Sequence, residues 1–160
     1  MGQQQVKVNY FWDYDNTAVG VDRIANVMEN LQKKFGKGSF DIVGNERVHK
    51  IRRCVSRLRN VDYKDTCGRN KNDEMLKKLI TDTDWSDGDK IVLITGDGDF
   101  QDVLVDLKEK KKDGIRVRSV IVHQTISKKL RRHADKTCPL DSFEERRSSS
   151  RLFCCCMARQ

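Results

Sequence analysis

Residues 91–100 read Ile91-Val92-Leu93-Ile94-Thr95-Gly96-Asp97-Gly98-Asp99-Phe100. The four apolar residues at the start predict a buried strand, and the polar turn after it places Asp97 and Asp99 at the strand's carboxyl end. Glycines at positions 96 and 98 let the backbone turn sharply and approach a ligand closely. The stretch therefore predicts a buried strand that ends in a turn able to hold a ligand.

The beginning of the chain repeats this pattern. An apolar and aromatic run from Val6 to Trp12 meets the polar segment Asp13-Tyr14-Asp15-Asn16. Further strands are predicted at 40–43, 61–63 and 115–122, with a short extended piece to 140, and helices through 24–35, 45–59, 75–80, 103–107 and, capped by Ser127, 130–134. Alternating strands and helices predict an α/β fold, a three-layer Rossmann-like domain whose central, mostly parallel sheet is flanked by helices.

Length and composition predict one globular domain. The chain has 160 residues, of which 37% are apolar and 35% are charged. We expect the domain over residues 6–145, between an N-terminal tail at 1–5 and a basic, cysteine-rich flexible tail at 146–160. No apolar run approaches the roughly 20 residues of a membrane-spanning helix, and no secretory signal pattern opens the chain. We therefore expect a soluble intracellular protein, with the cytoplasm favoured over the nucleus or an organelle.

The net charge of +8 is unevenly distributed. Six lysines and arginines lie between Arg47 and Arg59 beside the single acid Glu46, and four arginines but no acid lie from Arg146 onward. The acids gather instead at 13–15 and 82–102. A basic body with a local acidic centre suits a polyanion bound over a metal site, whereas a single run of charge is also compatible with a solvated surface.

The six cysteines form no CxxC pair, which argues against a structural zinc site. Cys54, Cys67 and Cys138 are expected to be reduced thiols. The run from Cys154 to Cys156 is not a prenylation box, because Met157 stands fourth from the end. An incidental tail feature is favoured there over palmitoylation.

Two predicted strands end in acids, one at Asp13 and the other at Asp97. If these strands are neighbours in a parallel sheet, their carboxylates share a small volume at its carboxyl edge. Like charges so close repel each other, and a bound cation offsets that repulsion. Oxygen ligands without a nearby His or Cys favour hard ions such as Mg²⁺ or Mn²⁺. The alternative is that these acids only form turns and cap helices.

The segment Phe11-Trp12-Asp13-Tyr14-Asp15-Asn16 has the pattern hydrophobic-Asp-x-(Asp/Glu)-Asn. It resembles the opening motif of NYN domains, a branch of the PIN-like nuclease superfamily, and residues 92–100 resemble that family's SGDSDF strand and turn. Asp73 stands where the family has its middle acid, at the start of a helix. Residues 120–123 and 130–135 resemble the end of the NYN domain in meiosis regulator and mRNA stability factor (limkain-like) proteins.

This resemblance implies a PIN-like fold and metal-dependent hydrolysis of phosphodiester bonds in RNA, with single-stranded RNA favoured. Asn16 would orient the first carboxylate or touch the substrate. The ion, Mg²⁺ or Mn²⁺, would activate a water molecule and neutralise charge in the transition state. The implied metal ligands, directly or through water, are Asp13, Asp73, Asp97 and Asp99.

Several residues outside the acidic centre are predicted to contact RNA. Tyr14, in the turn after the first strand, is the candidate for stacking on a base. The basic helix and the tail from Arg146 are candidates for binding backbone phosphates. Within the domain the candidate cations are Arg52, Arg53, Arg57 and Lys71. Protein partners and oligomeric state stay open.

Part of this sequence also fits the motif of a different enzyme class. Residues 13–17 also fit the DxDxT motif of haloacid-dehalogenase-type phosphatases, with Asp13 as nucleophile and Asp15 as general acid. Against this, residues 43–45 lack the Ser or Thr with which those enzymes hold the phosphate, and the chain after Thr17 leaves no room for their flap. A non-catalytic RNA-binding module is the second alternative.

Overall fold

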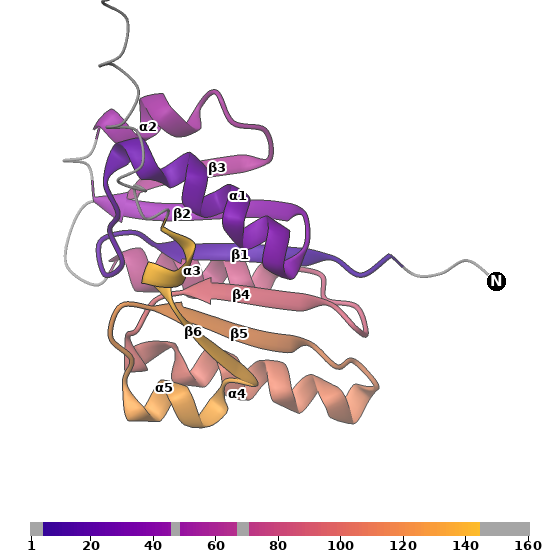
Figure 1. Cartoon of the computed structure of the whole chain (residues 1–160). Helices are drawn as coiled ribbons and strands as arrows, with labels where there is room; N and C mark the ends of the chain where they lie inside the picture. The colour runs from indigo at the N-terminus through magenta and orange to yellow at the C-terminus, as the bar shows by residue number, and fades with distance from the viewer. Residues whose placement is uncertain (1–4, 46–48, 67–70, 145–160) are drawn as a thin grey trace, which may run out of the picture.

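The centre of the protein is a six-stranded sheet. A computed structural model describes residues 5–45, 49–66 and 71–144 (Figure 1). The strand order is β3-β2-β1-β4-β5-β6, and every neighbouring pair is parallel. The strands are β1 (Val8–Asp13), β2 (Gly38–Asn45), β3 (Val61–Thr66), β4 (Lys90–Ile94), β5 (Arg118–His123) and β6 (Lys136–Pro139). The predicted α/β fold is confirmed, with a sheet that is parallel throughout.

Helices cover both faces of this sheet. The α-helices of the described residues are α1 (Ile24–Phe35), α2 (His49–Val55), α3 (Lys71–Asp82), α4 (Gln101–Glu109) and α5 (Lys128–His133). Short 3-10 turns are η1 (Val21–Arg23), η2 (Gly98–Phe100), η3 (Lys110–Asp113) and η4 (Leu140–Phe143). Buried side chains of α1, α2 and η4 pack on one face, and those of α3, α4 and α5 pack on the other.

The two central strands are held from both sides. In β1, Tyr10 and Trp12 pack toward α1, whereas Phe11 between them packs in the opposite layer. The run from Ile91 to Ile94 in β4 is fully buried, because helices cover both faces of a parallel sheet. The ends of β1 and β4 therefore project from the buried centre of the sheet.

Some element boundaries differ from the prediction. The helix expected over 45–59 is described only from His49 to Val55. Asn45 instead pairs with Thr66 in the sheet, and Asn60 takes a positive φ of 61°. The strand expected from residue 115 begins at Arg118, where pairing with β4 starts. The strands β2 and β3 extend beyond their apolar runs, because backbone pairing does not require apolar side chains.

Several predictions concern residues outside the described ranges. They are the ones made for Cys67, for positions 1–4 of the N-terminal tail, and for the tail from 146 with its three cysteines. Cys54 is exposed and Cys138 is buried, and both are free thiols. Within the described residues, no helix is long and apolar enough to cross a membrane.

Candidate metal centre

The sheet order brings the two acid-bearing strand ends together. β1 pairs with β2 on one side and with β4 on the other, so the chain changes direction across the sheet at β1 and β4. Asp13 is the last residue of β1, and Asp97 follows the end of β4 by three residues. Ligand sites of open parallel sheets form at such a switch point, at the carboxyl ends of the strands.

Three carboxylates meet at this edge. Asp73, Asp97 and Asp99 each offer an oxygen, and these oxygens all lie within 4.8 Å of one another. Asp73 comes from the first turn of α3. Asp97 caps η2 by accepting a hydrogen bond from the backbone N–H of Asp99 at 3.0 Å, which fixes the turn between them. Three of the four predicted ligands are thus brought together.

Asp13, the fourth predicted ligand, lies behind this group. Its side chain is only 2% exposed, and its Oδ2 accepts hydrogen bonds from Asn16 Nδ2 at 2.8 Å and Thr95 Oγ1 at 3.1 Å. Burial raises its pKa above the usual range, and the charges of Asp15 and Asp97 add to this effect. Asn16, which was predicted to orient the first carboxylate or to touch the substrate, contacts this carboxylate.

Asp73 shows how strongly the acids interact. Its pKa rises from 3.8 to about 6, first because it is partly buried and then because Asp13, Asp97 and Asp99 repel its charge. Lys77, one helical turn further along α3, opposes this rise. A cation among these oxygens would relieve the repulsion, and a donor set made only of carboxylates fits a hard divalent ion.

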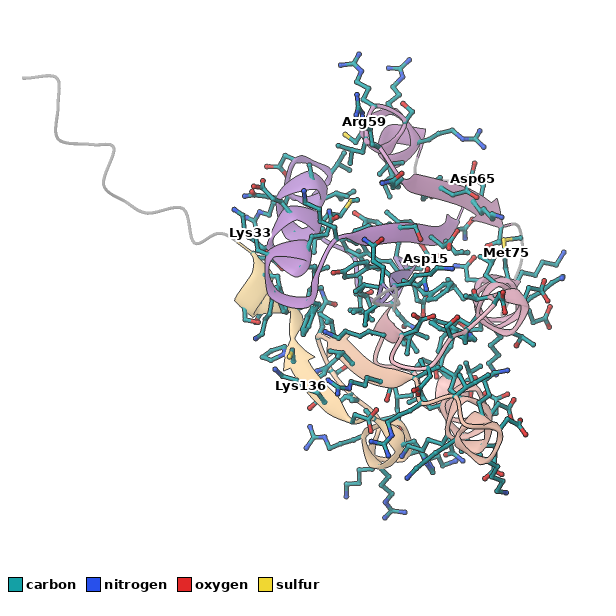
Figure 2. All side chains as sticks on the ribbon, turned by 90° about the vertical axis from the view of Figure 1, so that its right-hand side faces the viewer. Asp15, Lys33, Arg59, Asp65, Met75 and Lys136 are labelled. Atoms are coloured by element: carbon teal, nitrogen blue, oxygen red, sulfur yellow. The ribbon has the colours of Figure 1, made fainter. Side chains whose placement is uncertain are left out.

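The sequence analysis did not assign a role to some neighbouring residues. Asp15 joins two elements: its Oδ1 accepts from the backbone N–H of Asn45 at 3.2 Å and its Oδ2 from Asn72 Nδ2 at 2.5 Å. Figure 2 shows Asp15 between β2 and the helix that carries Met75. Lys77 pairs with Asp102 at 3.3 Å. Its spacing of four residues from Asp73 on one helix is the signal that would have revealed it.

The predicted RNA-binding cations lie on exposed surfaces. Arg52, Arg53 and Arg57 are exposed on α2 and the turn after it, and Arg52 also pairs with Asp65 at 3.4 Å. Arg53 and Arg57 line a cavity of about 530 Å³ with Cys54 and Ser56. Lys71 is exposed at the first position of α3.

Tyr14, the residue predicted to stack on a base, has a buried ring. The side chain is 4% exposed and its ring packs against Trp12, with centroids 5.6 Å apart. Its hydroxyl donates to the carbonyl oxygen of Val19. The turn after β1 folds back over the core, so the ring has no free face to offer a base.

The fold and this edge define an α/β protein with a carboxylate centre at the switch point of a parallel sheet. The chain belongs to the NYN domain family, whose model matches residues 7–141. NYN domains form a branch of the PIN-like nuclease superfamily. A crystal structure of a protein of unknown function from Vibrio parahaemolyticus has a similar fold, with a TM-score of 0.58 and 18% sequence identity. The similarity covers 90% of this chain and 98% of that one. The comparison with curated proteins found no significant match.

Proposed function

We propose that this protein is a metal-dependent ribonuclease that hydrolyses phosphodiester bonds in single-stranded RNA. The observation that carries the proposal is the approach of three carboxylate oxygens within 4.8 Å, from Asp73, Asp97 and Asp99, in a chain of the NYN family. Membership of a nuclease superfamily supports the reaction class. The positive charge around an acidic centre supports a polyanionic substrate.

The chain's own residues take distinct parts in this proposal. Asp73, Asp97 and Asp99 would hold Mg²⁺ or Mn²⁺, which when bound supplies charge neutralisation and water activation. Asp13, which is buried, adds negative charge to the site, and Asn16 and Thr95 fix the orientation of its carboxylate. Lys77 stands close enough to affect the pKa of Asp73, so it is placed to balance charge at the centre.

The structure weakens the phosphatase alternative. That mechanism requires the Asp15 carboxyl group to reach the substrate, but its oxygens accept hydrogen bonds from the backbone N–H of Asn45 and from Asn72, which hold it between β2 and α3. It also requires Asp13 to attack a phosphorus atom, whereas Asp13 is 2% exposed. The family match points to nucleases instead.

Two finer assignments belong to the same proposal. The resemblance of residues 120–123 and 130–135 to limkain-like proteins suggests a role in RNA turnover or regulation. The cytoplasm is the proposed location. A non-catalytic RNA-binding module remains the competing function, and only an activity measurement separates the two.

The test is incubation of the purified protein with labelled single-stranded RNA in the presence of Mn²⁺, Mg²⁺ or EDTA. Cleavage should require the metal, and Asp97→Asn should abolish it with the fold intact, because this change removes charge but little volume. An exposed acid on α3, Asp82, gives the matched control: Asp82→Asn should cleave normally. RNA binding without cleavage by the wild type would favour the binding module. Hydrolysis of a small aryl phosphate, lost in Asp13→Asn, would favour the phosphatase.

A further inference from the structure

A concentration of unpaired positive charge lies on α5, at the opposite edge of the sheet from α2 (Figure 1). Helix α5 buries Leu130 against the core and exposes four basic side chains, those of Lys128, Lys129, Arg131 and Arg132. Among the described residues, none of these four forms an ion pair. Their charges are therefore available to a ligand.

One end of α5 reaches the acidic centre. Ser127, the N-cap of α5, donates its backbone N–H to the carbonyl oxygen of Gly96 at 3.0 Å. Its Oγ would lie only 2.6 Å from a Cβ on Gly98, so the start of the helix touches the Asp97-Gly98-Asp99 turn. Burial lowers the pKa of His123 at the end of β5, and the positive charge of Arg131 lowers it further. Arg131 therefore also acts at this edge of the sheet.

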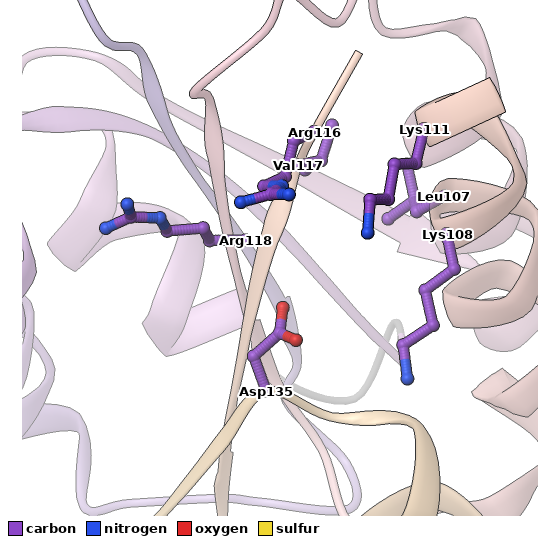
Figure 3. A pocket seen from close by; sticks show the side chains of 7 residues that line it. All are labelled: Leu107, Lys108, Lys111, Arg116, Val117, Arg118 and Asp135. Carbon is purple, nitrogen blue, oxygen red and sulfur yellow. The ribbon is translucent and has the colours of Figure 1, made fainter. Parts of the chain in front are cut away.

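The other end of α5 leads to a basic cavity of about 600 Å³. Lys108 and Lys111, from the end of α4 and from η3, extend their amino groups toward the side where Arg116 and Asp135 lie (Figure 3). Within the described part of the chain, these three cations also lack ion-pair partners. The guanidinium of Arg118, another lining residue, points away from them (Figure 3).

Asp135, the one acid among the described residues that line this cavity, is held by the sheet. Asp135 Oδ2 accepts hydrogen bonds from the backbone N–H of Ser119 at 2.8 Å and from its Oγ at 3.1 Å. The carboxylate is therefore fixed against β5, and three cations outnumber it. The cavity keeps a net positive charge that suits a phosphate group.

We propose that these cations bind the backbone of single-stranded RNA as it extends from the acidic centre, along α5 and into the cavity. We call this surface the α5 track; it consists of the four exposed cations of α5 together with Lys108, Lys111 and Arg116. The proposal rests on the ribonuclease proposal for its substrate. Lysine and arginine heads on an exposed surface contact phosphates without reading bases, so the track binds any sequence.

The experiment compares three double variants that each remove two positive charges. Arg131→Gln with Arg132→Gln tests the helix, and Lys108→Gln with Lys111→Gln tests the cavity. Lys33→Gln with Lys37→Gln is the control, because these two exposed lysines lie at the end of α1 and after it, in the opposite layer. Affinity for a labelled oligouridine of about 16 nucleotides is measured in EDTA over a range of salt concentrations, and again for one of about 4 nucleotides.

Removal of one phosphate contact should reduce the slope of log affinity against log salt by about 0.7. The helix and cavity variants should both have shallower slopes than the control with the long oligonucleotide. With the short oligonucleotide, which carries fewer phosphates, the differences from the control should be smaller. Slopes equal to the control's with the long oligonucleotide would overturn the proposal.

Binding of inorganic phosphate and cleavage of RNA are measured on the same variants. If the cavity variant no longer binds inorganic phosphate, followed by NMR, but binds the long oligonucleotide like the control, the cavity is a free-anion site and the track is overturned. Cleavage with Mn²⁺ is scored separately. A wild type that binds through the track but does not cleave would leave the track standing and refute the ribonuclease. Normal cleavage by the wild type, with track variants that bind RNA like the control, would overturn the track and leave the ribonuclease proposal standing.

Discussion

Asp73 has a pKa of about 6 in the metal-free fold, because burial and three neighbouring carboxylates disfavour its charge. A metal ion must displace the proton that Asp73 holds below this pH. We therefore expect Mn²⁺ affinity, measured by titration calorimetry, to fall steeply as pH is lowered from about 7 to about 5. In Asp73→Asn, affinity should be lower throughout and this pH dependence should be reduced. An unchanged pH dependence in the variant would show that another group competes with the metal.

The raised pKa of Asp73 also makes the stability of the metal-free protein depend on pH. Metal affinity rises with pH, whereas this contribution to stability falls. Because the folded pKa of Asp73 lies above 3.8, its contribution to stability is present below about pH 4 and is lost as pH rises through about 6. Asp73→Asn should therefore stabilise the metal-free protein at neutral pH. The gain should be on the order of 1 kcal/mol or less, since Asp73 is partly exposed and solvent screens its charge. Urea unfolding in EDTA at neutral pH and near pH 4 measures it, and a gain that persists at the lower pH would contradict this account.

The hydrogen bond between Asp15 and Asn72 leads to a prediction about Mn²⁺ affinity. Their hydrogen bond ties the turn after β1 to the residue next to Asp73, so each should position Asp73 through the other. Asp15→Ala and Asn72→Ala should each weaken Mn²⁺ binding by about 10-fold, and the double variant should be little worse than either. Asp62→Ala, which removes an exposed acid on β3, is the control for net charge. Additive losses would mean that Asp15 does not act through Asn72.

Asp13, Asp97 and Asp99 could be proposed from the sequence because they follow the ends of apolar runs, whereas Asp73, at the start of a helix, was named only through the family resemblance. Tyr14 could not be judged in the same way: a tyrosine in a polar turn suggests exposure, and only the path of the chain buries its ring. Lys77 could have been found from its spacing of four residues from Asp73, but the role of Asn72 could not, since it depends on how α3 docks against β1 and β2. A helix face is readable from spacing, but its partner strand is not.

At the scale of elements, the turn after β4 packs tightly against the turn after β5. A Cβ on Gly96 would lie 1.6 Å from the carbonyl oxygen of Thr125, which is backbone and cannot swing aside. Gly96→Ala should therefore cost about 3 kcal/mol of unfolding free energy or more, and it should weaken metal binding by displacing Asp97. Gly114→Ala is the comparison: nothing lies within 4 Å, so only its φ of +79° penalises alanine, by about 1 kcal/mol. Equal losses in urea unfolding would show that the two turns are not in close contact.

Element types were easier to predict than their ends. The apolar runs that form β1, β4 and α1 identify these elements, because a buried strand or an amphipathic helix needs its apolar residues in a fixed spacing. The second helix is described over fewer residues than its apolar stripe suggests. Leu58 continues the stripe and packs against the core, but it does so from the turn beyond Val55. Burial therefore does not prove that a residue is helical.

At the scale of the whole molecule, the acidic centre lies between basic surfaces. The α2 arginines project near the β3 edge and the α5 track lies near the β6 edge, with the switch point of the sheet between them. The sequence indicated the first surface because its cations are contiguous. The second basic surface could not be predicted from the sequence. Its cations come from segments 108–116 and 128–132, which only the packing of α4 beside α5 brings together.

The tail from residue 146 provides a prediction about the whole chain. Its four arginines carry positive charge without any acid, so we expect them to bind RNA phosphates. Removing residues 146–160 should leave the unfolding free energy nearly unchanged, because Leu140 and Phe143 already close the core from η4. It should also reduce the salt slope of RNA binding by up to about 0.7 for each arginine that contacts a phosphate, and leave the metal requirement as it is.

Two full-length variants identify which tail residues matter. Replacement of the four arginines by glutamine should reproduce the shallower salt slope of the truncated protein, because it removes the same charge. Replacement of Cys154–Cys156 by serine should keep the slope of the wild type, because neutral thiols release no counterions. If the serine variant instead behaves like the truncation, the cysteines and not the arginines mediate the contact. If all of the slopes superimpose, the tail does not touch RNA, and the positive charge that binds the substrate belongs to the domain alone.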